Sequence, residues 1–156
     1  MVSVSNESKC VLSVSIHYAP GEYGMTKIIT ISPMYILVNN TSSVFSVVMN
    51  PFTYVKVRQT GCMEIYDLNP SEPKGWHWSD ANKKPLIQFQ QVDINSLWTD
   101  SVTLSLGEQM VAIRTFEEET LSVDKECVLR IFSVMQNHQT IITLEYAVFM
   151  RIDHYY

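Results

Sequence analysis

The sequence is poor in positive charge. It has 11 lysines and arginines against 16 acidic residues, for a net charge of −5, and no basic cluster exceeds the pair Lys83 and Lys84. Proteins bind nucleic acids and anionic lipid surfaces through concentrated positive charge. We therefore expect no nucleic-acid partner.

Motifs that carry chemistry are also missing. The chain has five glycines and contains neither G-x-S-x-G nor a Gly-rich phosphate loop. The four histidines, at positions 17, 77, 138 and 154, lie in different segments, and no two have the local spacing of metal ligands. His77 could meet Cys62 only through the fold, and nothing in the sequence supports a site there. The sequence predicts no enzyme activity, no metal and no cofactor.

Cysteines are few, and long apolar runs are absent. Cys10, Cys62 and Cys127 are odd in number, far apart and without a Cys-x-x-Cys pair, which indicates reduced thiols in a cytoplasmic setting. No stretch reaches the roughly 18 apolar residues of a membrane span, and residues 1–20 lack the pattern of a secretory signal. We expect a single domain over residues 10–150, with terminal extensions at 1–9 and 153–156.

The residues that are abundant are those of β-strands. Alternation is clearest in residues 10–18, where Cys10, Leu12, Val14, Ile16 and Tyr18 share one face, and it predicts a half-buried strand. Further strands are predicted at 27–31, 34–38, 44–49, 52–58, 63–67, 85–91, 101–106, 109–116, 127–135 and 140–150. A helix is conceivable only at 117–126. The expected fold is all-β, an antiparallel β-sandwich of roughly eight to ten short strands.

The longest irregular stretch, residues 69–82, holds Trp76 and Trp78. If the segment is extended, both rings share one face and His77 points the other way. Two interpretations remain open: the rings form an aromatic shelf for a proline-rich peptide, or they plug the end of the sandwich. Trp98 precedes an alternating strand and is expected in the core.

Two strands are candidates for sheet edges, residues 10–18 and residues 52–58. An extended peptide can add to such an edge as a further strand. Lys56 and Arg58 lie on one face of the second segment, and we interpret their charge as protection against aggregation.

Four stretches together carry a family likeness. They are residues 31–42 (ISPMYILVNNTS), 73–79 (PKGWHWS), 84–89 (KPLIQF) and 97–107 (LWTDSVTLSLG). In this order they resemble one repeat of the adaptor-binding region of the vacuolar protein sorting thirteen proteins, the bridge-like lipid-transfer family. The repeat opens with a Ser-Pro-aromatic strand, here containing Pro33 and Tyr35, and runs into an Asn-x-Thr.

The resemblance implies a non-catalytic β-sandwich module that sits in tandem with neighbouring repeats of the same chain. Such modules bind adaptors with a Pro-x-Pro motif, which target a cytoplasmic lipid-transfer protein peripherally to organelle membranes and contact sites. Asn39 takes the position of the repeat's hallmark asparagine, with Asn40 the weaker claimant. The alternatives are an unrelated peptide- or lipid-binding β-sandwich of membrane trafficking, or a purely structural spacer repeat.

Asn39 ends an apolar strand, and its side-chain amide offers two donors and an acceptor. It could hold a turn by bonding nearby backbone groups, as Asn commonly does. It could also order a loop that borders a peptide groove beside Trp76 and Trp78. Both roles require the amide to be buried and hydrogen-bonded.

Overall fold

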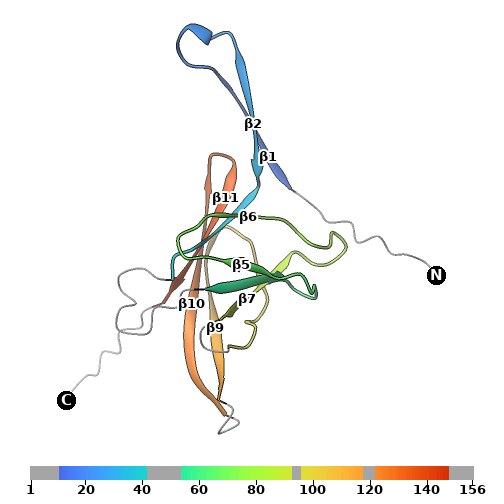
Figure 1. The fold of residues 1–156 in the computed structure, drawn as a ribbon, viewed down its shortest axis with the longest axis vertical. Helices are drawn as coiled ribbons and strands as arrows, with labels where there is room; N and C mark the ends of the chain where they lie inside the picture. The colour runs from blue at the N-terminus through green and yellow to red at the C-terminus, as the bar shows by residue number, and fades with distance from the viewer. Residues whose placement is uncertain (1–10, 42–53, 93–95, 118–121, 148–156) are drawn as a thin grey trace, which may run out of the picture.

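The computed structural model describes residues 11–41, 54–92, 96–117 and 122–147, and these residues form strands almost throughout (Figure 1). The strands are β1 (Leu12–Tyr18), β2 (Lys27–Pro33), β3 (Tyr35–Asn39), β4 (Val55–Gln59), β5 (Tyr66–Leu68), β6 (Lys74–Trp76), β7 (Leu86–Gln91), β8 (Val102–Thr103), β9 (Gly107–Glu117), β10 (Ser122–Gln136) and β11 (Gln139–Tyr146). A short 3-10 turn at Gly21–Tyr23 joins β1 and β2. The expected all-β sandwich is confirmed.

Two sheets share one core. The first has the order β6-β3-β11-β10-β9, and the second has the order β5-β4-β7-β8. Alternate residues of each strand point inward, as in β4 with Val55 and Val57 and in β11 with Ile142 and Leu144, all at most 2% exposed. A single cluster of buried side chains joins both sheets, so they form the two layers of a sandwich.

Among the named strands, the pairing is antiparallel except between β3 and β11. β3 and β11 run parallel, with Tyr35 beside Thr140 and Asn39 beside Leu144. The hairpin from β10 to β11 turns at Asn137 and His138, whose φ angles of 49° and 64° match a two-residue turn of the kind that suits twisted strands.

The structure corrects several predictions about individual elements. The stretch 69–82 contains β6, which is paired with β3. No helix occupies the described part of 117–126, because β9 ends at Glu117 and β10 begins at Ser122. Residues 52–58 are not an edge, because β4 lies between β5 and β7. The strand expected at 44–49 and the terminal extensions lie outside the described residues.

The strand expected at 10–18 forms as β1 from Leu12, but its apolar face is not half-buried. β1 pairs with β2 as a separate two-stranded ribbon that projects from the sandwich (Figure 1), and Leu12, Val14, Ile16 and Tyr18 are 51–64% exposed. Ser13, on the opposite face, is buried. Cys10, which the sequence placed on the same face, lies outside the described residues. Among the described residues no helix is long and apolar enough to cross a membrane.

Candidate functional site

Asn39 ties the two sheets together. It is the last residue of β3, in the first sheet, and its side-chain Nδ2 donates a hydrogen bond of 3.0 Å to the backbone oxygen of Leu68, in β5 of the second sheet. Its Oδ1 accepts from the backbone N–H and the hydroxyl of Thr41, at 3.2 and 2.6 Å. The Asn39 side chain is fully buried. The amide thus holds the turn after β3 and, in addition, fixes the end of β5.

The backbone of Asn39 positions the chain that follows β5. Its carbonyl accepts a hydrogen bond of 2.6 Å from the N–H of Ser71, and Asn39 forms an isolated parallel bridge with Pro70. Ser71 adopts a φ of 58°, in the left-handed region that residues with a side chain rarely occupy. Asn40 is half-buried, and its side-chain Nδ2 donates a hydrogen bond of 3.2 Å to the Glu145 carboxylate. Asn39, rather than Asn40, is therefore the asparagine that joins the two layers.

Trp76 and Trp78 do not form an exposed shelf. Their side chains share one face, as the alternation predicts, but that face points into the core, where they are 3% and 6% exposed. Their rings meet edge to face, with centroids 5.8 Å apart. Because both faces of each indole are covered by the core, neither can stack on a peptide proline. The interpretation in which they plug the sandwich fits their burial.

Beside the buried tryptophans, two aromatic side chains reach the surface: Tyr66 and His77. Tyr66, in β5, is half-buried and packs edge to face against Trp76 and His77, with both centroid distances at 5.5 Å. His77 is also half-buried and places its Nε2 3.1 Å from the Tyr66 hydroxyl. The ammonium of Lys74 also lies near this ring, 5.7 Å from the Tyr66 ring centroid. The buried Trp76 therefore supports Tyr66, which with His77 reaches the surface.

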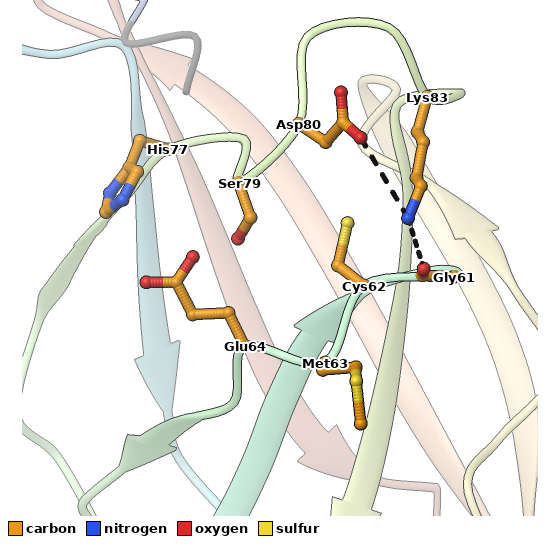
Figure 2. A pocket seen from close by; sticks show the side chains of 8 residues that line it. All are labelled: Gly61, Cys62, Met63, Glu64, His77, Ser79, Asp80 and Lys83. Carbon is orange, nitrogen blue, oxygen red and sulfur yellow. Dashed lines mark hydrogen bonds and ion pairs between the residues drawn. The ribbon is translucent and has the colours of Figure 1, made fainter. Parts of the chain in front are cut away.

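A cavity of about 670 Å³ opens beside this pair (Figure 2). Its walls come from the turn after β4, with Cys62 and Glu64, and from the segment after β6, with His77 and Ser79. In Figure 2 the Glu64 carboxylate points between His77 and Ser79, while Met63 points away. The cavity is thus lined mainly by polar groups that can donate or accept hydrogen bonds.

The far wall of the cavity is pinned by a buried glutamine. Gln59, fully buried at the end of β4, donates to the backbone oxygens of Asp80 and Lys84 at 2.9 and 3.3 Å and accepts from the Asp80 N–H at 2.9 Å. Lys83 reaches across to the Gly61 carbonyl and to the Asp80 carboxylate (Figure 2). These bonds hold the loop of residues 80–84 against the turn at Gly61.

Glu64, His77 and Ser79 line the cavity, and Tyr66 lies beside them; we call these four residues the rim. Hydrogen bonding sets the electrostatics of the rim. The hydroxyl of Tyr66, followed by that of Ser79, lowers the pKa of Glu64 below its ordinary value of 4.5. Burial raises the pKa of Tyr66, and its bond to Glu64 raises it further. With the tyrosine proton directed at Glu64, the Tyr66 hydroxyl oxygen is left to accept a hydrogen bond, and His77 can donate it only in the form that carries a proton on Nε2. The rim therefore presents a carboxylate that is ionised at neutral pH.

His77 and Cys62 do line the same cavity, although they come from separate segments. Among the described residues no group of three or more His, Cys, Asp or Glu side chains is arranged to hold a metal ion. Tyr66, Glu64 and Gln59 were not identified from the sequence. The alternation of 63–67 placed Tyr66 in a strand, but only the fold shows that the stretch meets Trp76 and His77.

The remaining residues singled out in the sequence have packing roles. Tyr35 is half-buried and meets Trp78 edge to face at 6.1 Å. Pro33 is exposed, and its ring packs against Gly75. Trp98 is half-buried rather than fully inside the core, and the guanidinium of Arg58 stacks 4.0 Å from its ring centroid. Arg58 thus lies on the central strand β4 and covers the Trp98 ring, which corrects the interpretation of its charge as edge protection.

Comparison with known proteins places the chain in a family. Residues 1–145 match the model of the vacuolar-sorting associated protein 13, adaptor binding domain. A comparison with curated proteins finds no match. The family match covers β1 to β10 and most of β11, including Asn39 and the whole rim of the cavity. The chain therefore belongs to the adaptor-binding domain family of the vacuolar-sorting associated protein 13.

Proposed function

We propose that this chain is a non-catalytic recognition module that binds an extended, Pro-x-Pro-containing segment of an adaptor protein at the rim formed by Tyr66 and His77. The observation that carries the proposal is the supported aromatic pair beside the 670 Å³ cavity, within a chain of an adaptor-binding family. Proline-rich segments dock on aromatic surfaces because their extended shape is set before binding.

The chemistry of the rim suits such a segment. A proline ring can pack on the accessible part of Tyr66, while the ionised Glu64 can accept hydrogen bonds from backbone N–H groups of the residues between the prolines. Trp76 and Asn39 act indirectly: Trp76 supports the Tyr66 ring, and Asn39 fixes the end of the strand that carries it. Both are positioning residues in this proposal.

The proposed biological setting is supported by the family match alone. As part of a vacuolar-sorting protein, the module is proposed to work in the cytoplasm beside neighbouring repeats, where adaptor binding brings a lipid-transfer protein peripherally to organelle membranes or contact sites. A spacer repeat with no ligand of its own is the competing function. The accessible aromatic pair favours recognition, because a spacer has no need of supported rings at its surface.

Isothermal titration of the chain with a synthetic Pro-x-Pro peptide tests the proposal. We expect saturable binding that Tyr66→Ala weakens about tenfold or more, as expected for an aromatic anchor. His77→Ala, a smaller change at the same rim, is expected to weaken binding in the same direction. Phe132→Ala is the matched control, because Phe132 is another accessible ring with a cation, Arg130, at 5.7 Å.

Three results would contradict the proposal: no binding up to millimolar peptide, equal loss in Tyr66→Ala and Phe132→Ala, or binding unaffected by both rim variants. The first would favour the spacer function. Circular dichroism of each variant establishes that the sandwich is intact before its affinity is compared.

A further inference from the structure

The ribbon of β1 and β2 exposes a continuous apolar face. Its antiparallel register places Leu12 opposite Pro33, Val14 opposite Ile31 and Ile16 opposite Ile29, so these side chains lie on the same side of the ribbon. Leu12, Val14, Ile16, Tyr18, Ile29 and Ile31 are each 51–64% exposed. Together they exceed the few hundred Å² of contiguous apolar surface that a monomeric protein ordinarily leaves open to water.

The other side of the ribbon is largely polar. Ser13 lies opposite Ser32, Ser15 opposite Thr30, and His17 opposite Ile28. Strict alternation of apolar and polar residues is the pattern of a sheet with one buried face. A two-stranded ribbon alone in water is marginally stable. The alternation therefore predicts that the apolar face of the ribbon packs against another surface, and the described part of the sandwich does not provide that surface.

The base of the ribbon holds it in a defined position. Met34, between β2 and β3, accepts a hydrogen bond of 2.7 Å from the Thr140 N–H and donates one of 3.0 Å to the Val11 carbonyl. The Gln139 amide donates to the Pro33 carbonyl at 2.9 Å, and the Pro33 ring packs on Gly75. The ribbon leaves the sandwich from this anchored base (Figure 1).

The charge of the face limits what can cover it. No acidic side chain lies on it, and its one cation is Lys27 at the tip, with Nζ 5.9 Å from the Tyr18 ring centroid. A single lysine on a chain of net charge −5 gives little attraction to an anionic lipid surface. A partner surface that is itself apolar and uncharged, in contrast, can cover this face without burying an unpaired charge.

We propose that the apolar face of the β1–β2 ribbon docks on the same face of a second copy of this chain. In a two-fold arrangement the tip of one ribbon lies over the base of the other, which keeps both lysines at the ends of the interface, in water. Because six side chains on each ribbon are more than half exposed, two such faces would bury roughly 1,000 Å² in total, about the least area that a specific protein interface needs. This proposal is independent of the adaptor site.

Sedimentation equilibrium of the full 156-residue chain, from micromolar to millimolar concentration, tests the proposal. We expect a reversible dimer that Ile29→Glu weakens by about tenfold or more, because its carboxylate would be buried in the interface. Thr30→Glu is the matched control. Thr30 is the next residue of the same strand, is also exposed and points to the opposite face.

The control variant must dimerise like the wild type. A wild-type chain that stays monomeric throughout, a dimer that survives Ile29→Glu, or equal dissociation in both variants would overturn the proposal. Flotation with phosphatidylserine-containing vesicles gives a second arm. A monomeric chain that floats with vesicles and loses this property in Ile29→Glu would assign the face to lipid instead.

Discussion

Asn39 shows how one side chain can serve both the fold and the site. Its buried amide makes three hydrogen bonds and thereby joins β3 to the end of β5. Tyr66, at the other end of β5, carries the accessible ring. The position of the ring thus depends on a residue that has no contact with solvent.

Replacing Asn39 by alanine is expected to lower the free energy of unfolding by about 2–4 kcal/mol, because the Leu68 carbonyl and the Thr41 donors lose a buried partner. Urea denaturation followed by fluorescence measures the change. Asn40→Ala is the control, with an expected loss under about 1 kcal/mol, since Asn40 is only half-buried and bonds one carboxylate. Equal midpoints for wild type and Asn39→Ala would contradict this role.

The rim carboxylate gives the stability a specific pH dependence. Because the pKa of Glu64 is lower in the folded chain than in the unfolded one, the stabilisation is present above about pH 4.5 and is lost as the pH falls through the folded-state value. Glu64→Gln is expected to flatten this part of the profile. The effect is small, since Glu64 is exposed and its interactions are screened by solvent.

Thermal denaturation between pH 3 and pH 6, about the range in which carboxylates titrate, measures this dependence. Tyr66→Phe removes the hydroxyl that lowers the pKa most and is expected to flatten the profile in the same way. If both variants keep the wild-type profile, the Tyr66–Glu64 bond does not contribute to stability.

At the scale of elements, alternation predicted most strands because inward and outward positions differ in the sandwich layers. It located β7 at 85–91, where the structure has Leu86–Gln91, and β4 at 52–58, where it has Val55–Gln59. The strand β6 was missed, because Pro73 before it and Gly75 within it are signals of irregular structure and only three residues pair. Its existence depends on β3, a partner far away in the sequence.

Alternation could not predict which apolar faces would be covered. β1 has the same pattern as strands of the core, yet its face is exposed, because burial depends on what lies opposite rather than on the strand itself. The same limit applies to the tryptophans. Their spacing predicted a shared side but not whether that side faced the core or a ligand.

The junction between the ribbon and the sandwich requires glycine at position 75. A Cβ there would lie 2.7 Å from Cγ of Pro33, a ring atom with little freedom to move. Gly75→Ala is expected to cost about 1–3 kcal/mol of stability through overpacking. Gly24→Ala is the control, since its Cβ would meet only the Gly21 carbonyl at 3.5 Å, an ordinary contact. Equal melting temperatures for the two variants would contradict the close approach.

For the molecule as a whole, the chain combines a sandwich built on one core with two surfaces of different chemistry. β6 lies between them: Gly75 contacts the base of the ribbon, and the adjacent Trp76 supports Tyr66 at the rim. The family match implies an adaptor partner, and the proposed function assigns that partner to the aromatic pair of Tyr66 and His77.

The central claim is that an adaptor segment binds at Tyr66 and His77. Chemical-shift mapping of the isotope-labelled chain, titrated with a Pro-x-Pro peptide, tests it most directly. We expect perturbations concentrated on Glu64, Tyr66, His77 and Ser79, with the β1–β2 ribbon unaffected. Perturbations centred on the ribbon or on the outer face of β9 and β10, with the rim unchanged, would contradict it.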